Sequence, residues 1–278
     1  MCKNDYIVNI DADEIPHKFF MNNMKDILRA NPTIDLYWVP RINTVDGITQ
    51  EHIDKWRWQV NEKGSVNFPD YLMTQGKYQH KPELPFGLGM EGSGVIEKIG
   101  QDIKNFQISD EVTFGALGQG AFSDYVLVSE RACDLKPKNL TFEQAAAFQT
   151  AYLTAYVSLV RRGDLRKGEN LLVHGATGGV GMAAVQLGKY LGATVIATGT
   201  SEEKLEITKQ WGADHTILTH KNDIVEFKDE VKDLTEGKGA DVIYDPVGGD
   251  VFDHSVRCMN WGGRILICLL YTSPSPRD

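Results

Sequence analysis

The chain has 278 residues, of which 42% are hydrophobic and 24% charged, which is sufficient for two globular domains with hydrophobic cores. Its formal net charge of -9 at pH 7 argues against a nucleic-acid-binding protein, which would normally carry a basic face. The four cysteines are too scattered for a zinc site or a disulfide framework, and the sequence shows neither a signal core nor a membrane-spanning run, so we expect a cytoplasmic protein.

The first half of the chain contains two different patterns. Residues 6–10, YIVNI, predict a strand that ends in an acidic turn, residues 16–32 have helical spacing, and residues 35–42 predict a second strand. Past residue 65, the segments GSGVIEKIG, DEVTF and AFSDYVLVS predict strands separated by glycine turns, as in a small β-rich domain. Residues 141–162 predict one continuous helix.

From residue 169 onward, strands alternate with helices. The predicted strands are NLLVH, TVIATG, HTIL, DVIYDPVG and GRILI, and a helical pattern lies between each pair of them. This alternation predicts the α/β fold class, with a doubly wound parallel Rossmann sheet.

The segment NLLVHGATGGVG, residues 170–181, places glycines between a strand and a helix. Gly178, Gly179 and Gly181 have no Cβ atom, so the backbone can approach a pyrophosphate at the positive N-terminal end of the helix. We predict that this loop, with Ala176 and Val180, binds a dinucleotide. The alternative is a glycine-rich turn that binds no ligand.

The tip of the next strand, ATGTSEEKLE, indicates which dinucleotide binds. An NAD site usually carries a carboxylate there for the ribose 2′-hydroxyl. This tip instead carries Gly199, Thr200, Ser201 and, in the first turn of the following helix, Lys204. Lysine and hydroxyl groups suit a 2′-phosphate, so NADPH is the predicted cofactor. The neighbouring Glu202 and Glu203 are acids of the kind that a helix dipole favours in its first turn.

Residues 66–267 resemble the zinc-free NADPH:quinone oxidoreductase branch of the medium-chain dehydrogenase/reductase superfamily. The resemblance is carried by VNFPDYLMTQGKYQHKPELPF, GMEGSGVIEKIG, AAAFQTAYLTAY, HGATGGVGMAAVQLGKYLGATVIATG and DVIYDPVGGD. It implies a GroES-like catalytic domain, incomplete here, over residues 66–140 and an NADP-binding Rossmann domain over residues 141–267. It also implies hydride transfer from the nicotinamide to a quinone or an activated enone, with hydrogen bonds from the protein to the developing oxyanion.

The resemblance also assigns individual residues. Asn67 and Tyr78 would lie near the nicotinamide, and Thr154 would contact the cofactor. The alternatives are a turn residue for Asn67 and a strand-packing aromatic for Tyr78. Where the family often has a tyrosine to cover the 2′-phosphate, this chain has Thr219.

No catalytic zinc is expected. The positions that hold the metal in zinc alcohol dehydrogenases of this superfamily match Asn67 and Met90 here, although the adjacent Glu91 is retained. Neither an amide nor a thioether suits a catalytic zinc, which binds thiolate, imidazole or carboxylate.

Residues 1–65 resemble a different family, the family 2-like glycosyltransferases with a GT-A fold. In YIVNIDADE, a strand delivers Asp11 and Asp13, whose carboxylates suit the divalent metal of a nucleotide-sugar site. The last residues, CLLYTSPSPRD (268–278), match the translation of a sequencing adapter and are predicted to be a non-native tail. We therefore interpret the chain as chimeric, with a seam near VNFPDY.

The sequence thus predicts a zinc-independent NADPH-dependent oxidoreductase that acts on a small-molecule quinone or enone. Neither nucleic acid nor a membrane is an expected partner, and the intact parent would form a homodimer. Because the catalytic domain is incomplete, weak NADPH binding and little turnover are expected of this chain. The alternatives are a metal-dependent glycosyltransferase that uses Asp11 and Asp13, and a nucleotide-binding protein without catalytic activity.

Overall fold

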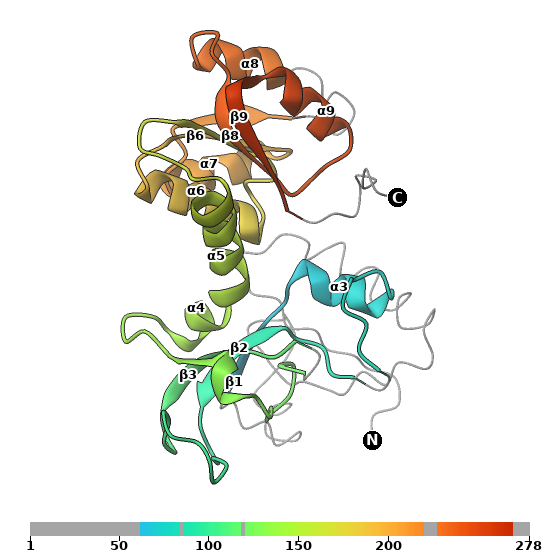
Figure 1. The fold of residues 1–278 in the computed structure, drawn as a ribbon, viewed down its shortest axis with the longest axis vertical. Coiled ribbons are helices and arrows are strands. Elements are labelled where there is room, and N and C mark those ends of the chain that lie inside the picture. Colours follow the sequence, from blue (N-terminus) through green and yellow to red (C-terminus); the bar gives the residue numbers. More distant parts are fainter. Residues whose placement is uncertain (1–61, 84–85, 118–119, 220–226, 269–278) are drawn as a thin grey trace. The chain divides into compact units, whose positions relative to one another are not determined.

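A computed structural model describes residues 62–83, 86–117, 120–219 and 227–268, and Figure 1 shows the fold. The chain divides into two compact units, with the boundary between Thr150 and Ala151. The elements predicted before residue 62, with Asp11 and Asp13, lie outside the described residues, and so does the tail from residue 269.

The first unit contains a four-stranded antiparallel sheet in which the strands follow sequence order. Its strands are β1 (Glu62–Ser65), β2 (Glu91–Val95), β3 (Glu111–Gly115) and β4 (Cys133–Leu135). The short helix α3 (Phe68–Thr74) follows β1, and the 3-10 turn Glu130–Ala132 precedes β4. Val112, Phe114, Ala116 and Ala121 form its small core. Two of the three predicted strands are therefore present, as β2 and β3.

The strand predicted over AFSDYVLVS is wrong, because residues 121–129 form bends and extended segments without a ladder. The Ser123 hydroxyl approaches the backbone oxygens of Gly120, at 2.6 Å, and Tyr125, at 2.8 Å. Such local side-chain contacts with the backbone stabilise a turn in competition with a strand.

The predicted helix over residues 141–162 is divided into three pieces, α4 (Phe142–Ala146), α5 (Gln149–Tyr156) and a π-helical turn, Val157–Arg162. Thr141 caps α4 in a capping box with Gln144. The break follows from a tertiary contact, because the Thr150 N–H donates to the Glu91 carboxylate. A helix that continued through α4 would use this N–H for an i−4 carbonyl.

The second unit contains a five-stranded parallel sheet in the order β7-β6-β5-β8-β9. The strands are β5 (Asn170–Val173), β6 (Thr194–Gly199), β7 (His215–Leu218), β8 (Ala240–Asp245) and β9 (Met259–Ile267). The connecting helices are α6 (Gly179–Tyr190), α7 (Glu202–Gln210), α8 (Phe227–Leu234) and α9 (Asp250–Arg257). All the strands predicted after residue 169 are present, and the predicted fold class is confirmed.

Successive strand residues pack into different cores on the two faces of this sheet. Leu171 and Val173 of β5 join residues of α5, α6 and α7 in one cluster, whereas Leu172 joins α8 in the other. This alternation follows from the two-residue period of a strand, and it requires strands that are apolar on both faces. Figure 1 shows helices on both sides of the sheet.

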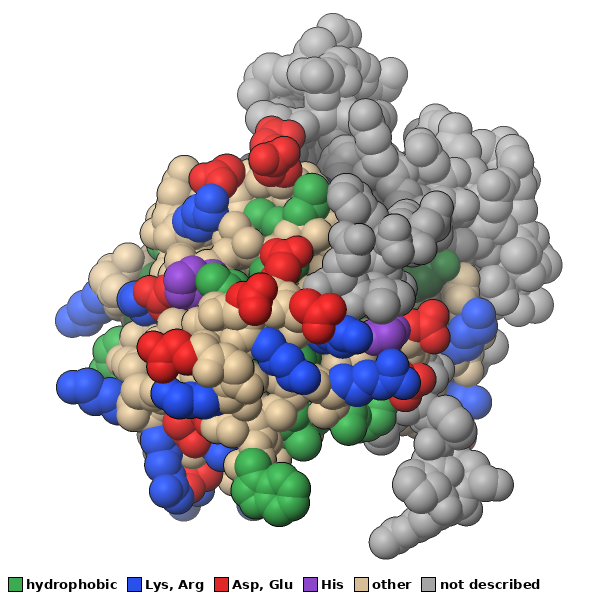
Figure 2. Space-filling model, turned by 90° about the horizontal axis from the view of Figure 1, so that it is seen from above, with side chains coloured by type: hydrophobic (Ala, Val, Ile, Leu, Met, Phe, Trp, Pro, Cys, Tyr) green, Lys and Arg blue, Asp and Glu red, His purple; other side chains and the backbone are tan. Residues whose placement is uncertain are grey.

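The carboxyl ends of β5, β6 and β8 lie at one edge of this sheet because the strands are parallel. In open α/β sheets, ligands bind at that edge, where the strand order reverses, which here is between β5 and β8. On the face shown in Figure 2, acidic and basic side chains of the described residues are interspersed. No helix in the described ranges is long and apolar enough to cross a membrane.

Candidate functional site

The glycine loop between β5 and α6 has the backbone of a tight strand-to-helix turn. Gly175 has a φ of 57°, in the left-handed region, and the Gly178 N–H donates to the Gly175 carbonyl at 3.0 Å. A Cβ atom on Gly181 would lie 2.2 Å from that same carbonyl oxygen, so only glycine fits there. The close approach of the first helical turn to the strand end therefore depends on the sequence GATGGVG.

The loop presents backbone donors at the start of α6. Gly178 is the N-cap, and the Met182 N–H is the first to bond back to it, so the N–H groups of Gly179, Val180 and Gly181 have no intrahelical partner. Ala176 lies buried beneath the loop and its N–H donates to Thr198 on β6 at 3.0 Å. An anionic group such as a pyrophosphate fits these donors and the positive end of the helix dipole.

A buried histidine that the sequence analysis did not single out holds this loop in place. His174 directly follows β5 and is 1% exposed, and its ring nitrogens lie 2.9 Å from Thr198 Oγ1 and 2.8 Å from Ser255 Oγ. Because the Ser255 hydroxyl donates to the Val251 carbonyl, it must accept from Nε2–H, and Thr198 then donates to Nδ1. Burial lowers the pKa of His174 to about 4, so the ring is neutral at pH 7.

The tip of β6 lies beside the loop and carries the residues predicted to select the cofactor. Gly199 is buried, Thr200 is exposed, and Ser201 is the N-cap of α7. Lys204 lies half-buried in the first turn of α7 and forms no ion pair with any residue that the structure describes. Thr219 donates its backbone N–H to the Gly199 carbonyl at 2.8 Å. This tip can therefore offer a cation and hydroxyl groups to a phosphate.

Asp245 at the end of β8 adds a buried carboxylate to the same edge of the sheet. Its Oδ1 accepts the N–H groups of Val247 and Gly248, both at 2.9 Å, which fixes the turn after the strand. Its Oδ2 is buried and has no hydrogen-bond partner among the described residues. The edge thus has unpaired N–H donors at the start of α6, and a buried acceptor without a partner among the described residues lies at the end of β8.

In the first unit, two buried carboxylates hold Asn67. Asn67 is the N-cap of α3, and its backbone N–H donates to Asp70 Oδ2 at 2.9 Å. Its side-chain Nδ2 donates to Glu91 Oε1 at 2.8 Å, and the other Glu91 oxygen accepts the Thr150 N–H at 2.7 Å. Asp70 Oδ1 accepts the Gly89 N–H at 3.0 Å. Burial raises the pKa of both carboxyl groups, that of Asp70 to about 7.

Tyr78 and Thr154 are less constrained. Tyr78 is half-buried in a bend after α3 and is not itself part of a strand. Thr154 is half-buried on α5, the helix whose Tyr152 hydroxyl donates to Gln186 of α6 at 2.7 Å. Ala151 and Ala155 of α5 pack in the same core cluster as α6.

Asn67 and Met90, which the resemblance matches to the metal-binding positions of zinc alcohol dehydrogenases, do not fit a catalytic zinc. Asn67 Nδ2 and both Glu91 oxygens are engaged in hydrogen bonds with each other and with the backbone, and Met90 offers only a thioether. The described residues contain no group of three or more His, Cys, Asp or Glu side chains that could hold a metal.

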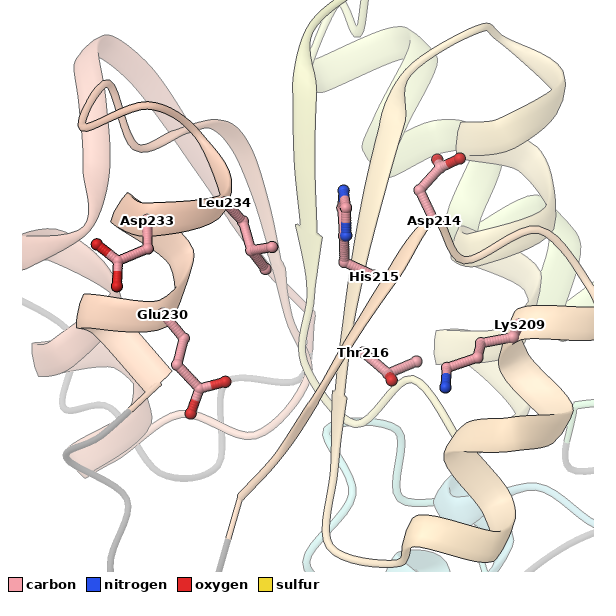
Figure 3. Close-up of a pocket in the computed structure, with 7 residues that line it drawn as sticks. All are labelled: Lys209, Asp214, His215, Thr216, Glu230, Asp233 and Leu234. Carbon is pink, nitrogen blue, oxygen red and sulfur yellow. The ribbon is translucent and has the colours of Figure 1, made fainter.

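A separate pocket of about 420 Å³ lies against edge strand β7, and Figure 3 shows the residues that line it. They are Lys209, Asp214, His215, Thr216, Glu230, Asp233 and Leu234. Asp214, His215 and Thr216 lie at the amino end of a parallel strand, opposite the edge that carries the glycine loop. Asp214 is already paired with Lys189. This pocket is therefore not part of the nucleotide site.

Two protein-family models match the chain. The model described as "Alcohol dehydrogenase GroES-like domain" matches residues 61–138, and the one described as "Zinc-binding dehydrogenase" matches residues 179–275. The first match begins before residue 66 and includes β1, which pairs with β2. The second extends into residues 268–275, which the sequence analysis assigned to the tail.

Curated relatives and solved structures agree with these models. A quinone oxidoreductase-like protein 2 homolog of Nematostella vectensis is 39% identical over 202 residues, covering 72% of this chain and 54% of the relative. A quinone oxidoreductase of Pseudomonas aeruginosa is also 39% identical, over 72% of this chain and 60% of the relative. The structure of a Pseudomonas syringae quinone oxidoreductase superimposes with a TM-score of 0.64 at 35% identity, over 74% of this chain and 65% of that one.

A mycobacterial protein whose structure was solved in complex with NADPH is 29% identical, with a TM-score of 0.67, over 74% of this chain and 63% of that chain. The chain spans 54% of the length of the Nematostella vectensis relative and 60% of that of the Pseudomonas aeruginosa relative. These comparisons do not support the resemblance of residues 1–65 to a glycosyltransferase or the interpretation of the chain as chimeric.

Proposed function

We propose that this chain binds NADPH and transfers hydride to a quinone or an activated enone. The part of the chain that the family models match, residues 61–138 and 179–275, belongs to the medium-chain dehydrogenase/reductase superfamily and is quinone oxidoreductase-like. The observation that carries the proposal is the glycine loop, whose unpaired N–H groups face the carboxyl edge of the parallel sheet at the start of α6.

The residues of this chain would bind and orient the two reactants. The N–H groups of Gly179, Val180 and Gly181 would hold the pyrophosphate, with Thr154 as a further cofactor contact. Asn67 and Tyr78 are the candidates for contacts with the reacting groups. When bound, the nicotinamide supplies the hydride, and the protein contributes orientation and exclusion of water.

The preference for NADPH over NADH rests on the tip of β6. Ser201 and Thr200 offer hydroxyl groups, and Lys204 offers an ammonium group without an ion-pair partner among the described residues. A 2′-phosphate carries about two negative charges and accepts charge-assisted hydrogen bonds from such groups. No carboxylate ends the strand itself, where a 2′-hydroxyl would be bound in an NAD site.

A pair of glycine substitutions tests whether the loop binds the cofactor. A Cβ atom on Gly178 would meet only the Gly175 oxygen at 3.5 Å, an ordinary contact, so Gly178→Ala should leave the fold unchanged. Its methyl group would nevertheless lie on the path of a pyrophosphate, and we expect NADPH affinity to fall about tenfold or more. Gly181→Ala should instead destabilise the second unit by roughly 1–3 kcal/mol, because its Cβ atom would lie 2.2 Å from a backbone oxygen.

The measurements are NADPH fluorescence titration and thermal unfolding, with Gly100→Ala as the control. At Gly100 an added Cβ atom would meet nothing closer than Ile103 Cγ1 at 3.9 Å. Equal NADPH affinity of Gly178→Ala and the unsubstituted chain would exclude the loop as the binding site. Oxidation of NADPH with a soluble benzoquinone tests the reaction, and binding without any quinone-dependent oxidation would favour a nucleotide-binding role without catalysis.

A further inference from the structure

The hydrogen bonds of the Asn67 side chain restrict what this residue can offer to a bound ligand. A side-chain amide has two N–H donors and one carbonyl oxygen that can accept two hydrogen bonds. Asn67 Nδ2 donates to Glu91 Oε1 at 2.8 Å and also reaches the Ser65 carbonyl oxygen at 3.5 Å. Both donors of the amide are therefore directed at acceptors within the protein.

The Glu91 carboxylate accepts the hydrogen bond from Asn67 Nδ2. It is 1% exposed at the start of β2, and its second oxygen accepts the Thr150 N–H at 2.7 Å. The Asn67 side-chain amide and the Thr150 N–H are the donors that this buried carboxylate needs, because an ionised carboxylate has no proton to donate. Glu91 thus fixes the direction of the Asn67 amide, with the nitrogen toward Glu91 and the oxygen turned away from it.

The oxygen of the amide keeps a free position. Asn67 caps α3 in a capping box whose other member is Asp70, and the Asp70 N–H donates to the Asn67 backbone carbonyl at 3.0 Å. The side-chain oxygen Oδ1 has two lone pairs. Since Asn67 is only half-buried, Oδ1 is the polar atom of the side chain that remains for a ligand.

We propose that Glu91 is a positioning residue that holds the Asn67 side-chain N–H groups in hydrogen bonds within the protein. Asn67 then offers a bound ligand only its carbonyl oxygen, as an acceptor. Its partner on the ligand is then a donor, either a hydroxyl or an amide N–H group, and Asn67 does not donate to a developing oxyanion. This inference rests on the proposed function and specifies the part that Asn67 plays in it.

An exchange of side chains tests the polarity of this pair. Asn67→Asp alone places two carboxylates against each other. Glu91→Gln alone has two unfavourable orientations: either its NH₂ group faces the Thr150 N–H, or its NH₂ group faces the NH₂ group of Asn67. In the double variant Asn67→Asp/Glu91→Gln the introduced amide can accept from Thr150 and donate to the introduced carboxylate. The net charge of the chain is unchanged, and position 67 again offers an acceptor.

We expect each single variant to lower kcat/KM for NADPH and benzoquinone about tenfold to a hundredfold, and the double variant to recover most of that loss. A double variant that is folded by circular dichroism and is no better than the single variants would overturn the proposal, because a donor role at position 67 cannot be restored by a carboxylate. Equal activity of Glu91→Gln and the unsubstituted chain would overturn it as well.

A nuclear magnetic resonance measurement tests the same point without turnover and without a variant that must fold. The Asn67 side-chain NH₂ protons should exchange with water more slowly than those of the exposed Asn139, both without ligand and after NADPH and a non-reducible quinone analogue are added. Exchange as rapid as that of Asn139, with or without ligand, contradicts the proposal. If the chain does not bind NADPH, the proposed function fails, while the exchange rate still tests the orientation of the amide.

Discussion

The substitution Asp70→Asn should remove a pH dependence from the stability of the first unit. Asp70 is 2% exposed, and burial raises its pKa from 3.8 to about 7. Because the folded state then binds more protons than the unfolded state between these pH values, stability falls as the pH rises from about 4 to about 7. The difference of roughly 3 pKa units corresponds to about 4 kcal/mol at 1.36 kcal/mol per unit.

The substituted side chain should reverse the order of stability across this range. An Asn amide cannot titrate, so the free energy of unfolding of the variant should not fall by about 4 kcal/mol between pH 4 and pH 7. Its NH₂ group would face one of the two N–H donors that Asp70 now accepts, those of Asn67 and Gly89, which costs about 1–3 kcal/mol at any pH. We therefore expect the variant to be less stable than the unsubstituted chain at pH 4 and equally or more stable at pH 8.

Urea unfolding at several pH values, followed by circular dichroism, measures the overall effect. Hydrogen exchange of the Asn67 and Gly89 amides reports on the first unit alone, because both amides donate directly to Asp70. Asp102→Asn is the matched control, since Asp102 is exposed. Stability curves of the unsubstituted chain and Asp70→Asn that stay parallel from pH 5 to pH 8 would refute the reasoning.

Two further substitutions test the second unit. Lys204→Ala should lower NADPH affinity about tenfold and leave NADH affinity unchanged in fluorescence titrations, with Lys209→Ala, which removes a lysine from the last turn of the same helix, as the control. An equal loss for both cofactors would exclude a contact with the 2′-phosphate. Because burial lowers the pKa of His174, the stability of the unsubstituted chain should fall by about 3 kcal/mol as the pH falls from 6.5 to about 4. The stability of His174→Gln should not show this fall. Urea unfolding at pH 4 to 7 measures this, and equal slopes would contradict it.

The parallel sheet could be predicted from the sequence because its signals are local. Apolar runs such as NLLVH and TVIATG are strands buried on both faces, and the intervening helices have their own periodicity. The break between α4 and α5 could not be predicted in this way. It depends on the contact between Thr150 and Glu91, which are far apart in the sequence.

The site shows the same division between local and distant signals. The glycine loop follows from GATGGVG, and Asn67 with Asp70 at N3 and Pro69 between them is a helix-start signal that was available in NFPD. Glu91 and His174 acquire their roles only in the fold. The ring of His174 connects Thr198 with Ser255, and no spacing in the sequence indicates that these three residues meet.

The two buried titratable groups act on stability in opposite directions. As the pH rises from 4 to 6.5, the first unit loses stability because folding keeps Asp70 protonated, while the second gains stability because His174 of the unfolded state loses its proton. Each group belongs to a different unit, so acidification should strengthen one unit while it weakens the other. The order in which the two units unfold should therefore depend on pH. Neither group can be replaced by a neutral side chain without loss of contacts, because Asp70 accepts two backbone N–H groups and the His174 ring bonds to two hydroxyl groups. The pH dependence is thus a consequence of the burial of the two groups whose hydrogen bonds hold Asn67 and the glycine loop in place.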